Sequence, residues 1–521
     1  MRITNRMMTN NMLYNINNNK NMMNTLQERY STGLAIQRPS DDPIVAVRAL
    51  KLRTNLSELN QYYEKNIPDA KSWMETTESA LRITSEIITK IHTYCVQGAN
   101  DTLTEEDRDS IAANLNELRQ QIYQEGNANY AGRYLFSGYK TGTGLVFDNA
   151  TRDLEYRISE TIKSDGIEIS KRIVDSCDIS DFDIDDPTSF DTSVRPSENT
   201  VYRLRLAYDN LKRVEDGGAI SLKIPEVDEN GNYVYDIDAD GNNILQFEEE
   251  YDESDMNIFD SDDPLAYKPE PDEINYIEDT GEIILGEELY NKWRNSDFVI
   301  SYEKNSFEKN DLRPEHYFDC EKLDLTIQDD TEREEQKVVF HTEDQKISYE
   351  VNFNQKIAIN VQGRDAFRHS LGRMIDDIVK AVSDVQIVKY KMEEIDRALK
   401  DTALSDEQKS KLNEIKSVLQ TEFDLKDGIL HQVYERGIGA MEDEENTVNA
   451  ATADIGTRYN RIELTENRLS TQQTEFTDLL SQNEDADLVD TIVNYNAMET
   501  IYNASLSSAS KVVKNTLLDF L

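Results

Sequence analysis

The C-terminal segment of the chain, residues 455–521, repeats apolar residues at alternating spacings of four and three. Before an acidic break at 482–487, the repeated positions are Ile455, Tyr459, Ile462, Leu469, Phe476 and Leu480, with polar Glu466 and Gln473 between them. After the break, the pattern restarts one residue out of phase at Leu488, Ile492, Tyr495, Tyr502, Leu506, Ala509, Val513, Leu517 and Phe520. This spacing places a narrow apolar stripe on a helix, as in a coiled coil. Such a stripe has to be buried against the chain's own N-terminus, a helical bundle or a neighbouring copy.

The N-terminal segment, residues 1–35, carries a stripe of similar width. Its apolar members are Met12, Ile16, Met23, Leu26 and Tyr30, and most of the other positions are Asn, Thr, Lys or Glu. So thin a stripe in an Asn-rich segment gives only a marginal helix by itself. We therefore expect the two ends to pair, and both to be loose in the free chain and ordered on assembly.

The longest pattern of this kind follows a turn that ends at Pro43, and its members include apolar Trp73, Ile87 and Ile91 and polar Thr77 and Thr84. Asp41 or Asp42 can cap the helix that begins there, because an aspartate side chain accepts hydrogen bonds from the first backbone N–H groups of a helix. Pro43 supports the same start, because proline is favoured in a first helical turn. A helix over residues 44–97 would be roughly 80 Å long at 1.5 Å per residue. Pro68 lies within it and is expected to kink it.

The middle of the chain, residues 143–362, changes to an alternation of apolar and polar residues. Examples are residues 153–158 and 337–341, which read as short strands separated by Gly, Asn and Asp. The sequence therefore predicts a β-rich insertion, with a Pro-rich and acidic break near 260–272 that could divide it into two subdomains. Much of the acidic excess gathers here, as in residues 247–253.

Helical spacing returns in residues 364–435, which read as a helical hairpin added to the rod. Ser405 and Gln408 are spaced as a capping box at the start of its second helix. Thr104 and Asp107 have the same spacing at the start of an earlier helix, after the 98–100 turn.

The charge of the chain is strongly negative, with 56 Lys and Arg against 102 Asp and Glu and a net charge of -46. This excess repels phosphate groups, so nucleic acids and anionic membranes are not expected as partners. The three cysteines stand far apart, which argues against a disulfide framework. The N-terminus has no apolar signal core, and no run of 18 apolar residues spans a membrane. We interpret the chain as cytoplasmic, or as exported by a route that uses no signal peptide.

Catalytic and metal-binding motifs are not found in the sequence. The five histidines, His92, His316, His341, His369 and His431, are not close neighbours, and the sequence has no HExxH, P-loop, GxSxG or GxGxxG pattern. Residues 236–241 open like an EF-hand calcium loop, but the twelfth position is Phe247 where a bidentate Glu is needed. A hairpin turn is favoured there and at residues 228–232. No enzyme activity, cofactor or metal is expected.

Several motifs resemble those of the bacterial flagellin family. Near the N-terminus they are the turn at residues 33–43, which includes Arg38, Ser40, Asp41, Asp42 and Pro43, the corner with Gln97, Gly98 and Asn100, and the strand that begins at Gly132 and Arg133. Near the C-terminus they are residues 455–461, 483–487 and 504–521. The resemblance covers about residues 1–142 and 440–521. The 132–138 strand and the proline at residue 39 are more typical of the members that join the flagellar hook to the filament than of filament subunits.

The resemblance implies an α+β, multidomain fold, with a long helical coiled-coil rod built from both chain termini and a β-rich middle insertion. The expected regions are a core helix at 1–40, a helical rod and strand at 41–142, the insertion at 143–362, a second helical rod with the added hairpin at 363–482, and a core helix at 483–521. In the family, both core helices pack between subunits.

The function implied by the resemblance is that of a structural subunit in the ring at the hook–filament junction, on which flagellin polymerises. The implied partners are the other junction protein, flagellin, neighbouring copies and an export chaperone, and the location is the extracellular flagellum. Two alternatives remain open, namely a filament flagellin and a ligand-binding or adhesive role for the middle insertion.

Overall fold

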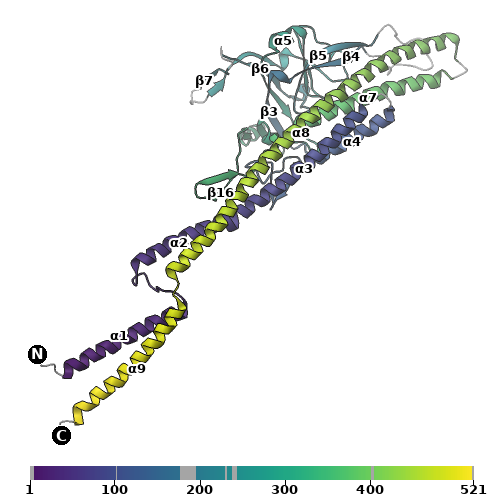
Figure 1. The fold of residues 1–521 in the computed structure, drawn as a ribbon. Coiled ribbons are helices and arrows are strands. Elements are labelled where there is room, and N and C mark those ends of the chain that lie inside the picture. Colours follow the sequence, from purple (N-terminus) through teal and green to yellow (C-terminus); the bar gives the residue numbers. More distant parts are fainter. Residues whose placement is uncertain are drawn as a thin grey trace. The chain divides into compact units, whose positions relative to one another are not determined.

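The computed structural model describes residues 5–100, 103–175, 195–228, 232–237, 243–400 and 404–518 (Figure 1). Its helices are α1 (Asn5–Thr32), α2 (Pro43–Gln61), α3 (Ile67–Gly98), α4 (Glu105–Glu125), α5 (Glu287–Trp293), α6 (Asp330–Glu335), α7 (His369–Ala398), α8 (Asp406–Glu484) and α9 (Leu488–Leu518). Its strands are β1 (Asn129–Tyr130), β2 (Arg133–Tyr134), β3 (Leu154–Ile162), β4 (Ile167–Val174), β5 (Ser197–Arg205), β6 (Ile220–Pro225), β7 (Tyr235–Ile237), β8 (Asn243–Leu245), β9 (Phe247–Asp252), β10 (Asn257–Phe259), β11 (Ile274–Ile277), β12 (Glu282–Leu285), β13 (Phe298–Lys304), β14 (Asp319–Asp324), β15 (Val338–Phe340), β16 (Ser348–Asn352) and β17 (Gln355–Ala358). The α+β, multidomain fold predicted from the sequence is confirmed.

The chain divides into two compact units. The first contains Met1–Lys71, Tyr349–Ile357 and Tyr459–Leu521. The second contains Ser72–Ser348 and Ala358–Arg458. Each unit therefore combines segments that are far apart in the sequence, and α3 and α8 each contribute to both units.

The first unit pairs N-terminal helices with C-terminal ones. α1 lies beside α9, and the Asn19 side chain donates a 3.2 Å hydrogen bond to the Ser505 hydroxyl. Segments of α2 and α8 meet where Gln473 Nε2 donates to Asn60 Oδ1 at 2.9 Å. The β16–β17 hairpin also belongs to this unit, since Asn66 Nδ2 donates to the Glu350 carbonyl at 2.8 Å. Residues 349–357 thus separate from the rest of the predicted 143–362 insertion.

The predicted single helix over residues 44–97 is interrupted. A π-helical turn, Tyr62–Asn66, separates α2 from α3. In it the Ile67 N–H donates to the Tyr62 carbonyl, five residues back. Pro68 follows directly and has no N–H to donate, so it cannot continue the ordinary hydrogen-bond ladder. The wider turn lies directly before Pro68, the residue at which the sequence predicts a kink.

The helical part of the second unit buries the seam that the spacing predicted in α3. Trp73, Ile87 and Ile91 are all at most 5% exposed. The polar seam members Thr77 and Thr84 are fully buried too, and each hydroxyl donates a 2.9 Å hydrogen bond to the carbonyl four residues earlier. Threonine is tolerated in this core because the helix itself satisfies its hydroxyl.

The β-rich part of the second unit contains a five-stranded and a six-stranded sheet. Their strand orders are β10-β11-β12-β5-β4 and β15-β14-β3-β13-β6-β9. Two-stranded ladders join β1 to β2 and β7 to β8, and β16 to β17 in the first unit. Both sheets face one core, to which the six-stranded sheet contributes Tyr156 and Ile300 and the five-stranded sheet contributes Leu204 and Ile283. The alternation in the sequence follows from this packing, because every second side chain points into the core.

The predicted division of the insertion near residues 260–272 is wrong. β10 precedes this segment and β11 follows it, yet the two strands pair in parallel within one sheet. The strands of both sheets also alternate along the chain and share a core. The Pro-rich and acidic composition marks a surface connection between paired strands, which composition alone cannot distinguish from a domain boundary.

His369, the first residue of α7, makes the stability of the second unit depend on pH. Its ring lies against those of Tyr208, Tyr317 and Phe318, with centroids 4.8, 4.7 and 5.3 Å away. Burial, with Arg373 beside it, lowers the pKa of His369 to about 3. Since the ordinary value is about 6.5, the unfolded chain binds one more proton here between these two values.

We expect acidification to destabilise the second unit through His369. Its contribution is fully present above pH ~6.5 and is lost as the pH falls toward 3, by about 1.4 kcal/mol per pH unit. His369→Phe, which cannot titrate, should flatten the pH dependence of the unfolding free energy in this window, measured by urea denaturation. Equal slopes for the variant and the unchanged chain would contradict this account.

Candidate assembly site

The predicted stripe of α1 lies on the side that faces α9. Ile16 is buried, Met12, Met23 and Leu26 are half-buried, and only Tyr30 is largely exposed. On α9, Tyr495 and Tyr502 are half-buried in the same way. The two ends of the chain therefore pair within one molecule along part of each predicted stripe.

Ala509 is half-buried as well, but three other members of the α9 stripe are exposed. Leu488, Ile492 and Leu506 are 48%, 40% and 44% exposed. The side chains of Val513 and Leu517, and all of Phe520, lie outside the described part of the structure. The role of these residues in packing between subunits therefore stays a prediction.

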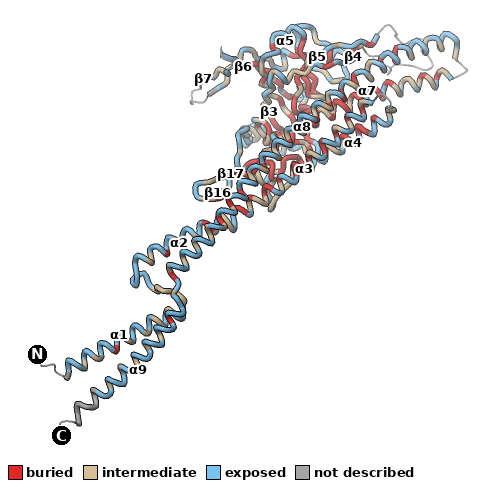
Figure 2. The backbone as a smooth tube through the Cα atoms, in the orientation of Figure 1, coloured by how far each residue is buried: buried red, intermediate tan, exposed pale blue. Residues whose placement is uncertain are grey.

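Figure 2 colours most of α1 and α9 as exposed, and both helices carry large exposed apolar side chains outside the predicted stripes. On α1, Met7, Tyr14 and Met22 are 57%, 67% and 60% exposed. On α9, Val489 and Val493 are 72% and 60% exposed. We did not predict this second surface from the sequence, although the seven- and eight-residue spacing from Met7 to Met22 is a signal that could have indicated it.

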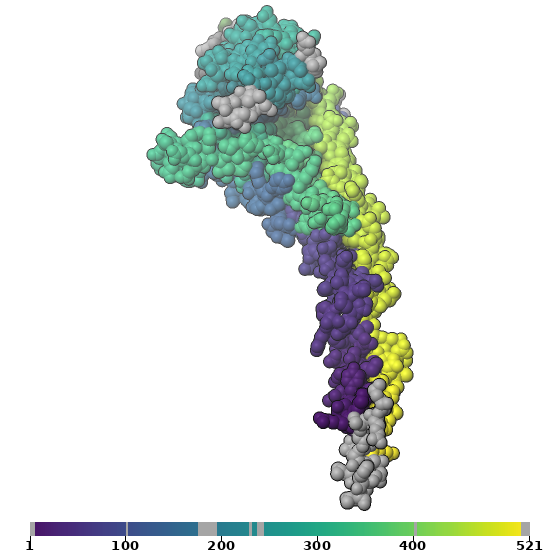
Figure 3. Space-filling view, turned by 90° about the vertical axis from the view of Figure 1, so that its left-hand side faces the viewer, coloured from purple at the N-terminus to yellow at the C-terminus, as the bar shows by residue number. Residues whose placement is uncertain are grey.

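The uncovered apolar surface is what makes the helix pair a candidate assembly site. Figure 3 shows α1 and α9 side by side. Burying a Val, Leu, Ile or Met side chain contributes about 1.5–3 kcal/mol, so several such residues favour further helix partners. We refer below to Leu488, Val489, Ile492, Val493 and Leu506 as the α9 outer surface.

The family-motif turn and the C-terminal corner join each other by backbone hydrogen bonds. The Ala35 N–H donates to the Glu484 carbonyl at 2.6 Å, and the Ala486 N–H donates to the Gly33 carbonyl at 2.8 Å. Gly33 has a φ of +75°, which glycine adopts without strain. This two-stranded bridge connects the segments that follow α1 and precede α9.

Side chains of the same turn fix the start of α2. Asp41 accepts hydrogen bonds from the N–H groups of Gln37 and Arg38, at 3.2 and 2.9 Å. Asp42 caps α2 by accepting from Ile44 N–H at 3.0 Å and Val45 N–H at 3.2 Å, and Pro43 occupies the first turn as predicted. The side chains of Arg38 and Ser40 are exposed. An ion pair also connects α2 with the end of α8, because the Arg53 guanidinium lies 2.7 Å from the carboxylate of buried Glu484.

The motif corner at the end of α3 is stabilised by a hydrogen bond within the corner and by contacts with α8. The Asn100 N–H donates to the Gln97 carbonyl at 3.0 Å. Arg108, which is 4% exposed, forms a 2.6 Å ion pair with Asp427 of α8. Gly98 faces the Tyr434 ring so closely that a Cβ atom built there would lie 2.3 Å from two ring carbons.

We therefore expect Gly98→Ala to destabilise the second unit by about 1–3 kcal/mol, because the added methyl overpacks a filled core. Thermal and urea unfolding measure this directly. Tyr434→Leu in the Gly98→Ala background should recover part of the loss by making room, whereas Gly439→Ala is the matched control, since a Cβ there meets no atom within 4 Å. Equal stability of the Gly98 and Gly439 variants would contradict the argument.

The strand motif forms a tight hairpin against α3. β1 and β2 are joined by Ala131 and Gly132, which have φ values of +51° and +78°. The Arg133 guanidinium lies over the Trp73 ring, 4.8 Å from its centroid, and Tyr130 meets the same ring edge-on at 6.4 Å. Gly132 thus allows the turn, and Arg133 stabilises it on the helix by a cation–π contact.

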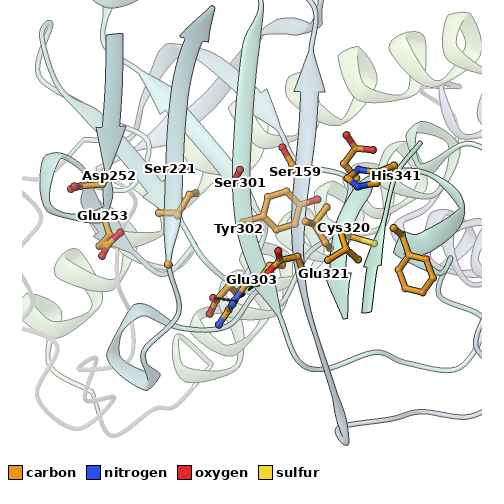
Figure 4. Close-up of a pocket in the computed structure, with 17 residues that line it drawn as sticks. Ser159, Ser221, Asp252, Glu253, Ser301, Tyr302, Glu303, Cys320, Glu321 and His341 are labelled. Atoms are coloured by element: carbon orange, nitrogen blue, oxygen red, sulfur yellow. Dashed lines mark hydrogen bonds and ion pairs between the residues drawn. The ribbon is translucent and has the colours of Figure 1, made fainter. Parts of the chain in front are cut away.

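A shallow groove crosses the outer side of the six-stranded sheet (Figure 4). Its floor includes Ser221, Ser301 and Ser159, which stand opposite one another on three adjacent strands. Arg157 also lines the groove, but Glu303 and Glu321 already pair with it at 3.0 and 3.5 Å. The polar groups of this floor are thus small or already paired.

The groove holds no activated nucleophile among its described residues. Cys320, which lines it, is 4% exposed, and burial raises the pKa of its thiol to about 12. A thiol with so high a pKa is a poor nucleophile at neutral pH. Cys95 is fully buried in the second unit, and burial raises the pKa of its thiol to about 12 as well.

Three other sequence predictions concern metals and membranes. Most of the 236–241 segment lies outside the described residues, but its flanking strands β7 and β8 pair as an antiparallel hairpin. Among the described residues, no group of three or more His, Cys, Asp or Glu side chains is placed to hold a metal ion. No described helix is both long and apolar enough to span a bilayer.

Comparison with protein families matches both ends of the chain. Residues 3–141 match the bacterial flagellin N-terminal helical region, and residues 438–521 match the bacterial flagellin C-terminal helical region. These segments contain α1 to α4 with the β1–β2 hairpin, and much of α8 with α9. The middle of the chain is matched by neither.

Individual relatives point the same way. The chain is 35% identical over 143 residues to a flagellin from Clostridium tyrobutyricum, which covers 27% of this chain and 38% of the relative. It is 35% identical over 153 residues to flagellar hook-associated protein 3 from Salmonella typhimurium, which covers 29% of this chain and 47% of the relative. The chain therefore spans less than half of the length of these curated relatives.

A crystal structure of flagellar hook associated protein-3 from Legionella pneumophila aligns with 83% of this chain and 97% of its own length, at 12% identity and a TM-score of 0.28. Similarity at this level is too low to establish a common fold. The two matched regions occur in the order and at the positions that the sequence motifs predicted. The N- and C-terminal regions of this chain, which form the helix pair and the bridge between its two ends, are therefore similar to the helical regions of bacterial flagellins.

Proposed function

We propose that this chain is a structural subunit of the bacterial flagellum, located at the junction between hook and filament, where flagellin polymerises onto it. The observation that carries the proposal is the apolar α9 outer surface, which stays exposed on a helix that already pairs with α1. A helix with apolar side chains on two sides requires more than one partner. Neighbouring copies in a ring supply such partners.

The hook–filament junction is favoured over the filament itself by two features. The 132–138 motif and the proline at residue 39 are more typical of junction members, and two curated relatives, from Salmonella typhimurium and Escherichia coli, carry the name flagellar hook-associated protein 3. The partners we propose are the other junction protein, flagellin and further copies of this chain. Export without a cleavable signal peptide, assisted by a chaperone, belongs to the same proposal.

The role is mechanical rather than catalytic. The terminal helices bury apolar surface between subunits, at about 1.5–3 kcal/mol for each side chain. Ordering a segment costs about 1–2 kcal/mol per residue, so free subunits stay apart until an existing end offers a preformed partner. This balance restricts ring formation to the end of a hook.

Deletion of the gene distinguishes a junction subunit from a filament subunit. Without a junction subunit, we expect cells to keep their hooks and release flagellin into the medium, which immunoblots of cell and medium fractions measure. Without a filament subunit, the flagellin band itself would disappear from both fractions, and that result would overturn the junction assignment.

A further inference from the structure

A polar cavity of about 670 Å³ in the second unit has a composition unlike the rest of the chain. The first turns of α7, one side of α4 and residues of the 207–210 and 304–312 loops line it. Five Lys and Arg side chains face four Asp and Glu side chains there, whereas the whole chain has 56 against 102. Basic side chains are therefore concentrated at this site.

Two of these cations are buried deeply. Lys304 is 1% exposed, and its Nζ donates to the carbonyls of Asp209 and Asn210, at 2.5 and 3.4 Å. Arg373 is 8% exposed, and its Nη2 donates to the Thr280 carbonyl. Burying a charge is costly unless it meets opposite charge or several hydrogen bonds. The two carbonyls and Asp209 Oδ1, 3.9 Å away, provide these for Lys304, so Arg373 is the position that calls for a further anionic neighbour.

The acids of the cavity meet that need only in part. Asp209 Oδ2 lies 3.7 Å from Arg373 Nη1, and Asp376 Oδ2 lies 3.8 Å from it, both longer than a hydrogen bond. Asp376 is also engaged by Arg119. Among the described residues, Arg373 Nε, which is buried, has no hydrogen-bond partner.

Two further features add donors at the same place. His369 lines the cavity, and its buried Nε2 also has no hydrogen-bond partner among the described residues. The N-cap residue of α7, Arg368, provides no side-chain cap, although Tyr123 Oη accepts from the Gly372 N–H at 3.1 Å. The start of a 30-residue helix carries partial positive charge and N–H groups that favour an anion.

We propose that this cavity binds a small anion carrying a phosphate or carboxylate group, held by Arg373, His369 and the first turn of α7. Arg152 and Lys309, which line the cavity and are exposed, form its cationic rim. The ligand would connect α4 and α7 with the loops of the β-rich part, and so stabilise the second unit. The site is separate from the assembly surface and does not depend on the proposed function.

The test uses the full chain and inorganic phosphate as the probe. We expect phosphate to raise the melting temperature of the second unit saturably, while sodium chloride at equal ionic strength does not, and calorimetric titration to give one site per chain. Acetate in a parallel titration distinguishes a carboxylate ligand from a phosphate ligand. Binding of neither anion would overturn the proposal.

Charge reversal at the rim locates the site without disturbing the core. The double variant Arg152→Glu/Lys309→Glu should weaken binding at least tenfold with the melting temperature in chloride unchanged. The double variant Arg294→Glu/Lys400→Glu changes the net charge equally at exposed positions away from the cavity and should bind as the unchanged chain does. Equal weakening by both pairs would show only a general effect of charge and would overturn the assignment.

Discussion

Replacing Asp377 with alanine is expected to destabilise the second unit by about 3–5 kcal/mol, which exceeds the loss expected for Gly98→Ala. Asp377 lies on α7 and is buried against the five-stranded sheet. It accepts hydrogen bonds from Arg203 at 2.8 and 3.1 Å and from Arg205 at 2.5 Å. Removing its carboxylate leaves Arg203, which is fully buried, with less opposite charge than it needs.

Other members of the cluster are buried as well, and the arginines keep both of its buried carboxylates charged. Glu282, 1% exposed, pairs with Arg203 at 2.6 Å and accepts a 3.0 Å hydrogen bond from Tyr267. Burial would raise the pKa of Asp377, but Arg203 and Arg205 outweigh it and hold the value well below the ordinary range. Burial acts on Glu282 in the same direction, and Arg203 and Arg172 hold its pKa at about 2.

Urea unfolding of Asp377→Ala measures the loss, and an exposed ion pair in the same unit gives the matched control. Arg213 and Asp260 are 3.0 Å apart, but their side chains are 50% and 52% exposed. Asp260→Ala should therefore cost less than about 1 kcal/mol. If the two alanine variants were equally stable, the buried cluster would not be the contact that holds α7 on the sheet.

The helical seams were predicted well because they depend on local spacing. Ile16, Trp73 and Ile87 lie where the four-three pattern placed them, and Thr104 and Asp107 form the capping box that their spacing indicated. In each case the interacting groups are separated by only a few residues, or lie on one side of one helix. Such features can be read from one sequence without knowing the fold.

The strand order of the β-rich part and the ion cluster could not be predicted, because their contacts join distant segments. Arg203 meets Glu168, Glu282 and Asp377, which lie on two strands and a helix. The chain has 102 Asp and Glu residues, and no sequence spacing indicates which three of their carboxylates pair with Arg203. The exposed apolar side chains outside the predicted stripes, such as Tyr14 and Val489, were missed for a different reason, since the sequence shows that a residue is apolar but not how many partners its helix has.

The α9 outer surface leads to the second large expected effect, that Leu506→Asp abolishes incorporation into the flagellum. Leu506 is 44% exposed in the single chain, so an aspartate there stays hydrated and the chain should fold normally. In an assembly that covers this surface, the substitution loses about 1.5–3 kcal/mol of apolar burial and adds the cost of an unpaired buried charge. Each ~1.4 kcal/mol is a tenfold change in affinity, so we expect more than a ~100-fold loss.

Ser508→Asp is the matched control for this variant. Ser508 is exposed and lies two residues further along α9, about 200° around the helix from Leu506, and its replacement adds the same charge. In cells that lack the unchanged gene, the Leu506 variant should release flagellin into the medium, whereas the Ser508 variant should retain filaments. Hydrogen exchange of α3 and α4 in both purified variants establishes that the second unit is folded. Normal filaments from Leu506→Asp would mean that this surface stays open to solvent in the assembled flagellum, and the packing of subunits would then have to use another side of α9.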